Sequence, residues 1–70
     1  MGEQEAEVLE VNPVSIHGMP YVDVSLRFAD GALDRSRLGP ESMPGELRAG
    51  EQVLVTKVAN VVISLRRPGD

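Results

Sequence analysis

Strict alternation of apolar and polar residues is the feature that most constrains this chain. Between Tyr21 and Phe28 every second side chain is apolar, and the residues between them are polar or charged. A period of two is the signature of a strand with one buried and one solvated face. No stretch has the 3.6-residue period of an amphipathic helix. The sequence therefore predicts an all-β fold, with strands over 6–11, 21–28, 32–38, 52–58 and 61–66.

The same alternation predicts which side chains fill the interior. In each strong run one set of alternate residues is apolar and the other set is polar, so the apolar set is expected to face inward. The predicted inner set is Val22, Val24, Leu26, Phe28, Val53, Val55, Val61, Ile63 and Leu65.

Turn residues predict how the strands connect. Ala29-Asp30-Gly31 fits a three-residue hairpin loop closed by a left-handed glycine, which places Asp23 opposite Arg37 as an ion pair on the outer side. Ala59-Asn60 fits a second tight turn. Pro13 and residues 17–20 are expected to separate the first strand from the second, and residues 39–50 form an irregular link with room for one short helical turn.

Length then selects the architecture. Seventy residues make one domain, spanning residues 1–70. So short a chain has no further segments with which to cover the edges of a sheet, so we expect the sheet to close on itself. Five short strands, with the longest link between the third and fourth, predict a small five-stranded OB-like barrel; an SH3-like barrel is the alternative.

The sequence has few of the residues that serve in catalytic and metal sites. There is no cysteine, His17 is the only histidine, and no phosphate-binding glycine loop is present. Ser15 and Asp23 lie near His17 in sequence without the arrangement of a catalytic triad. The glutamates of the first strand alternate and indicate a solvated face instead of a metal site. We therefore expect no enzyme activity, no cofactor and no bound metal.

The acidic start, Met1-Gly2-Glu3-Gln4-Glu5, resembles neither a signal peptide nor a transit peptide, and the longest apolar run is three residues. The expected location is the cytoplasm, without membrane association.

The net charge indicates which class of partner the chain is expected to bind. Eleven acidic and seven basic residues give a net charge of −4, which disfavours nucleic acid because binding to it depends on neutralising phosphates. The candidate partner-binding residues are Tyr21, Arg27, Arg35 and Arg37. We expect a noncatalytic interaction module, a standalone OB-like barrel that binds a protein partner or itself. The alternative is an OB barrel that binds single-stranded nucleic acid weakly.

The uneven distribution of charge also suggests self-association. Residues 1–11 carry four glutamates and no base, whereas residues 57–67 carry Lys57, Arg66 and Arg67 and no acid. Opposite charges on separate elements suit head-to-tail contacts that close into a ring. If the first strand lies beside the last two, the same charges neutralise one another within one chain.

Several local patterns resemble a known family. Val22-Asp23-Val24, Ala29-Asp30-Gly31 and above all Leu47-Arg48-Ala49-Gly50-Glu51-Gln52-Val53-Leu54-Val55, followed by Ala59-Asn60-Val61-Val62, look like the OB domain of bacterial proteasomal AAA ATPases. That family has a coiled coil and an ATPase module that residues 1–70 lack, so the resemblance implies the fold and ring-like self-association, not ATP hydrolysis. The layout is also similar to small hydrogenase-maturation chaperones, whose initial Met-Cys is Met1-Gly2 here.

Overall fold

The computed structural model describes residues 2–69 and contains five strands and one short 3-10 turn. The strands form a single antiparallel sheet in the order β3-β2-β1-β4-β5. The predicted all-β fold is therefore confirmed. The elements are β1 (Gly2–Ile16), β2 (Met19–Phe28), β3 (Leu33–Leu38), η1 (Pro40–Ser42), β4 (Gln52–Val58) and β5 (Val61–Arg66).

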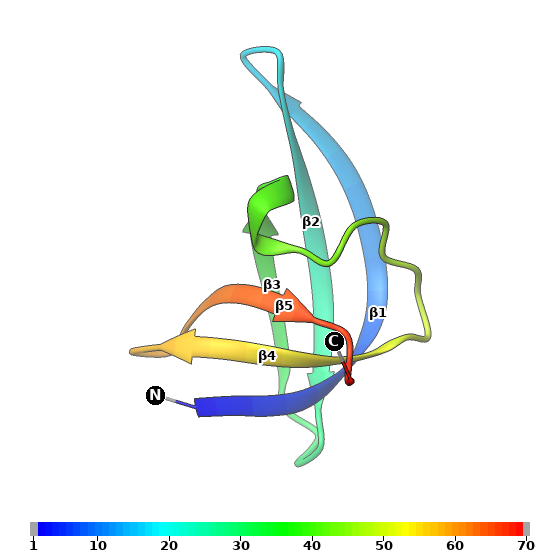
Figure 1. Ribbon diagram of the computed structural model, residues 1–70, viewed down its shortest axis with the longest axis vertical. Coiled ribbons are helices and arrows are strands. Elements are labelled where there is room, and N and C mark those ends of the chain that lie inside the picture. Colours follow the sequence, from blue (N-terminus) through cyan, green and yellow to red (C-terminus); the bar gives the residue numbers. More distant parts are fainter. Residues whose placement is uncertain (1, 70) are drawn as a thin grey trace.

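β1 is the central strand and belongs to two parts of the sheet. Its first residues, 2–7, pair with β4, and residues 6–16 pair with β2. Between Val8 and Glu10 the register with β2 shifts by one residue, which places a β-bulge at Leu9. A bulge bends a strand and increases its twist. In Figure 1, β1 accordingly lies beside β4 near the N-terminus and then curves upward beside β2 as a two-stranded arm.

The expected break at Pro13 does not occur. β1 continues through Pro13 to the turn formed by His17 and Gly18, both of which have positive φ. Beyond Glu7 the other edge of β1 has no strand partner within residues 2–69. A strand edge is where proline is tolerated, because no ladder hydrogen bond is needed there.

The interior lies between the two halves of this bent sheet. Most of the predicted inner set is correct, since Val24, Leu26, Val53 and Val55 have no exposed surface and Phe28 has almost none. The remaining buried side chains are Ala6, Val8, Leu38, Leu47, Val62 and Leu65.

Gly50 connects the irregular link to the core. Its φ of 95° is in the left-handed region that glycine adopts freely, and its N–H donates to the Val8 carbonyl at 2.7 Å. The turn at Gly50 therefore leads the chain into β4 beside β1.

The prediction for β5 was correct at Leu65 and wrong at Val61 and Ile63. Val61 and Ile63 were expected to face inward, but they are exposed, and Val62 and Leu65 are buried. The register between β4 and β5 shifts between Thr56 and Lys57, so that Ile63 has no opposite residue. One inserted residue reverses the inward and outward sides of a strand, which explains the reversal.

The β2–β3 hairpin follows the prediction. Gly31 has a φ of 90°, and its N–H donates to the Phe28 carbonyl at 2.9 Å. Asp23 lies opposite Arg37 in the register, and the two form the expected ion pair. The turn chemistry therefore determines the register of this hairpin.

The sheet remains open between its two edge strands. β3 and β5 are in contact but are not hydrogen-bonded neighbours within residues 2–69. Lys57 lies at this seam, with Nζ 3.8 Å from Asp34 Oδ2 and 4.9 Å from the centre of the Phe28 ring. Across these residues the only helical segment is the 3-10 turn η1, so no helix could span a membrane.

The basic residues near the end of the chain are paired within the molecule, one of them with the acidic start. Arg66 forms an ion pair with Glu3 on β1. Arg67 forms one with Glu51 at 2.8 Å and also donates to the carbonyls of Pro44 and Glu46. Lys57, Arg66 and Arg67 thus each have a carboxylate of the same chain beside them, which weakens the charge-based reason for head-to-tail association.

Candidate functional site

The four candidate partner-binding residues lie on one face of the sheet. In β2 the side chains of Val24, Leu26 and Phe28 point into the core, so the alternate residues Tyr21 and Arg27 point outward. The register aligns Arg35 with Ser25 and Arg37 with Asp23, which places both arginines on the same outer side. We call Tyr21, Arg27, Arg35 and Arg37 the arginine face.

Each arginine of this face is paired with a carboxylate. Arg37 donates from Nε and Nη2 to the two oxygens of Asp23 at 2.7 and 3.0 Å. Arg27 donates to Glu7 on β1. Arg35 reaches across β2 to Glu10, where the closest nitrogen–oxygen distance is 3.5 Å, the loosest of the three pairs.

The two-point hydrogen bond shifts the titration of both partners in the Asp23–Arg37 pair. It lowers the pKa of Asp23 and raises the pKa of Arg37 from their ordinary values. Both groups therefore stay charged over the neutral range, and the pair orients the Arg37 guanidinium above β2 and β3.

The arginines reach further into solvent than their carboxylates. The Arg35 side chain is 70% exposed against 54% for Glu10, and that of Arg37 is 50% exposed against 24% for Asp23. Arg27 is likewise more exposed than Glu7. A molecule that approaches this face therefore meets guanidinium groups before it meets carboxylates.

Two leucines that sequence reasoning missed lie beside the arginines. Leu9 and Leu33 are exposed and line a shallow hollow of about 350 Å³ together with Ser25 and Arg35. Leu9 is exposed because it is the bulged residue of β1. The one signal in the sequence is the spacing of Val8 and Val11, both on the inner side, which departs from a period of two.

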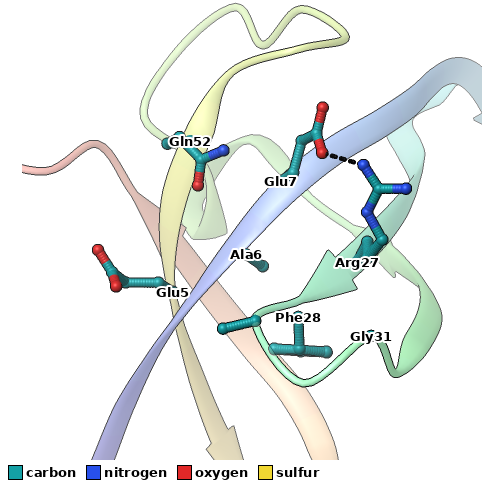
Figure 2. A pocket seen from close by; sticks show the side chains of 8 residues that line it. Glu5, Ala6, Glu7, Arg27, Phe28, Gly31 and Gln52 are labelled. Carbon is teal, nitrogen blue, oxygen red and sulfur yellow. Dashed lines mark hydrogen bonds and ion pairs between the residues drawn. The ribbon is translucent and has the colours of Figure 1, made fainter.

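A second hollow, of about 280 Å³, lies next to Arg27 at the β2–β3 turn (Figure 2). Figure 2 shows Glu5 and Glu7 on β1 with Gln52 on the neighbouring strand, and Glu7 turned toward Arg27. Glu7 is engaged by that ion pair, Glu5 is the only other carboxylate of the lining, and no histidine, serine or threonine lines the hollow. This hollow contains no set of groups for acid–base or nucleophilic catalysis.

The sole histidine lies apart from the arginine face. His17 is exposed in the turn at the end of the β1–β2 arm, with a φ of 51°. Within residues 2–69 no three His, Asp or Glu side chains are grouped so as to hold a metal ion.

The basic side chains are largely neutralised within the chain. Of the seven Lys and Arg residues, six form ion pairs with carboxylates of the same molecule, and the seventh, Arg48, forms none within the described part. A nucleic-acid phosphate would have to displace a carboxylate from each arginine that it contacted.

Three of these pairs predict how stability depends on pH. Hydrogen bonds from Arg66, Arg37 and Arg67 lower the pKa of Glu3, Asp23 and Glu51, respectively. A carboxyl whose pKa is lower in the folded state stabilises the fold above its unfolded pKa of about 4, and this contribution disappears as the pH falls toward the folded pKa. Urea midpoints are therefore expected to be level from about pH 7 to 5 and to fall below about pH 4.

Glu51→Gln tests this dependence at a single site. It should lower the urea midpoint at neutral pH and make the decrease of the midpoint below about pH 4 less steep. Glu41→Gln, at an exposed carboxyl with no ion pair among the described residues, should leave the midpoint unchanged at both pH values. If the urea midpoint of Glu51→Gln falls as steeply below about pH 4 as that of the wild type, the Arg67–Glu51 pair does not contribute to the pH dependence of stability.

No protein-family model, no curated protein and no solved structure matches the chain.

Proposed function

We propose that this chain is a noncatalytic interaction module, an OB-like barrel that binds a protein partner through the arginine face. The partner segment that fits carries carboxylates for Arg27, Arg35 and Arg37 and an apolar side chain for the hollow beside them. One observation carries the proposal: three outward guanidinium groups share one face of the sheet with an exposed leucine pair, and one of them, Arg35, lines the hollow beside the leucines.

The strand order supports the OB-like part of the proposal. An OB barrel is a five-stranded, partly open barrel that presents the outer face of its second and third strands to ligands. Here β1 pairs with both β2 and β4, the edge strands β3 and β5 are in contact, and Lys57 on β4 forms an ion pair with Asp34 on β3. The four candidate residues lie on β2 and β3.

The ion pairs of the arginine face do not prevent binding. Exposed ion pairs contribute little net free energy because solvent screens them, so a partner carboxylate can replace Glu10 at Arg35 at small cost. The interface also removes Leu9 and Leu33 from water, which is favourable. Arginine and tyrosine are the side chains most often found at the energetic centre of protein interfaces.

Weak binding of single-stranded nucleic acid is the second candidate, and the position of three arginines beside Tyr21 favours it. Single strands bind to positive grooves with aromatic side chains on which the bases stack. Here Phe28 is buried and Tyr21 is half-buried, so little aromatic surface is open for stacking, and the net charge of −4 repels a polyanion. The protein partner is therefore the better fit.

Fluorescence anisotropy with two labelled probes tests the proposal. One probe is a peptide of alternating Glu and Leu, and the other is an oligo-dT of similar length, both at about 150 mM salt, where exposed charges are screened beyond about 8 Å. We expect the peptide to bind and Arg35→Ala to weaken it about 5- to 10-fold. Arg48→Ala is the matched control, since Arg48 is exposed but lies in the link outside the arginine face, and it should not change binding.

Equal loss in both variants, or no binding of either probe, would contradict the proposal. Tighter binding of oligo-dT than of the peptide would replace the protein partner with nucleic acid.

A further inference from the structure

The three guanidinium groups of the arginine face differ in how firmly carboxylates of the same chain hold them. Those of Arg27 and Arg37 donate hydrogen bonds to their partners. Arg35 and Glu10 approach only to 3.5 Å, beyond the usual hydrogen-bond distance of about 2.7–3.2 Å, and their side chains are the most exposed of the three pairs. Arg35 is therefore the arginine that a second carboxylate can engage most readily, and Glu10 shows that a carboxylate fits there.

The loose pair spans β2 above a small side chain. Glu10 on β1 and Arg35 on β3 are each opposite Ser25 in the register. All three side chains point outward, because Val24 and Leu26, the neighbours of Ser25 in β2, are buried. Ser25 is the smallest side chain on the outer side of β2, so side chains of the two flanking strands can meet above it.

The hollow of about 350 Å³ lies beside the same serine. Leu9 from β1 and Leu33 from β3 line it together with Ser25 and Arg35. Both leucines are exposed, so an apolar side chain placed against them removes apolar surface from water. Because Arg35 also lines the hollow, a carboxylate beside that apolar side chain in the same segment lies within reach of the guanidinium.

We infer that the partner segment is recognised at two adjoining points, with its carboxylate at Arg35 in place of Glu10 and its apolar side chain in the hollow beside Ser25. Glu10 is then an internal competitor that limits affinity, because a partner carboxylate binds only after Glu10 has left Arg35. Ser25 determines specificity, because a larger side chain at this position would fill the hollow. The inference rests on the proposed function, since it describes how the arginine face selects its partner.

Fluorescence anisotropy with three labelled peptides of equal length tests the two points separately. The peptides alternate Glu with Leu, Glu with Ser, and Gln with Leu, and all are measured at about 150 mM salt. The wild type should bind the Glu-Leu peptide about 5- to 10-fold more tightly than either of the others, since each of these lacks one of the two contacts.

Ser25→Leu tests the apolar point. With the hollow filled, the preference for the Glu-Leu over the Glu-Ser peptide should fall from about 5- to 10-fold to less than about twofold. Ser25→Val provides a second variant with a smaller side chain, and circular dichroism shows that each variant is folded. Ser15→Leu is the matched control, because Ser15 is exposed near the end of β1 and does not line the hollow, and it should keep the preference of the wild type.

Glu10→Gln tests the competition. It should bind the Glu-Leu and Glu-Ser peptides about 2- to 5-fold more tightly than the wild type, which corresponds to the loss of one exposed ion pair. Binding of the Gln-Leu peptide should not change, because that peptide has no carboxylate to place at Arg35. Glu41→Gln is the matched control, since it removes the same charge at an exposed residue outside the arginine face.

A preference for leucine that survives in folded Ser25→Leu and Ser25→Val proteins would overturn the inference. So would a Glu10→Gln protein that binds the Glu-Leu peptide no more tightly than Glu41→Gln does. In either case, weaker binding by Arg35→Ala would leave the proposed function standing. If the Glu-Leu peptide binds neither the wild type nor Glu10→Gln, both the proposed function and this inference are wrong.

Discussion

Leu26→Ala is expected to remove a large part of the free energy of unfolding. Leu26 has no exposed surface and is the largest of the fully buried side chains, at the centre of β2 between β1 and β3. Truncation of a buried leucine costs about 2–5 kcal/mol, through lost transfer free energy and the cavity that remains. A domain of 70 residues has a free energy of unfolding of only roughly 4–10 kcal/mol.

Urea unfolding followed by circular dichroism measures this change. With a slope near 1 kcal/mol per molar urea, the midpoint should fall by about 2 M or more. Leu33→Ala is the matched control, since Leu33 is 71% exposed on the neighbouring strand, and its midpoint should remain within about 0.5 M of the wild type. Equal losses in the two variants would show that the core is not where the sheet places it.

Val62→Asp and Ile63→Asp, which alter adjacent residues, are expected to have opposite outcomes. Val62 is buried and Ile63 is exposed because of the bulge in β5. A carboxylate at position 62 would be taken out of water; Lys57 lies opposite it in the register but already pairs with Asp34, so we expect the substitution to cost about 3 kcal/mol or more. The same side chain at position 63 would be solvated.

Thermal unfolding separates the two variants directly. Ile63→Asp should show a cooperative transition near that of the wild type, and Val62→Asp should show little native structure. If Ile63→Asp lowers the unfolding temperature more than Val62→Asp does, then Ile63 faces inward as simple alternation predicts, and β5 has no bulge at Ile63.

The successes and errors of sequence reasoning share one physical cause. Where turn residues determine the register, as at Ala29-Asp30-Gly31, the sequence predicted both the strand pairing and the Asp23–Arg37 ion pair. Where a bulge inserts a residue, as at Leu9 and Ile63, alternation changes phase and the predicted inner and outer sides no longer apply. No local turn signal marks either bulge, because each depends on the partner strand.

The same distinction applies to the candidate site. Placing Tyr21, Arg27, Arg35 and Arg37 on one face needs only the strand period and the hairpin register, which the sequence contains. The carboxylates Glu7 and Glu10 and the exposed Leu9 come from β1, whose position beside β2 is a long-range feature. The sequence therefore predicted the arginines and the one carboxylate, Asp23, that the hairpin register places beside them, and not the residues that β1 contributes.

The central claim is that a protein segment binds the arginine face, and mapping that contact tests it most directly. Amide chemical shifts of the isotopically labelled protein can be followed while the Glu-Leu peptide is added at about 150 mM salt. The account predicts that the largest shifts occur on the outer side of β2 and β3, around Arg27, Arg35 and Arg37, and that oligo-dT at the same concentration changes little. Shifts confined to other elements, or larger shifts with oligo-dT than with the peptide, would contradict it.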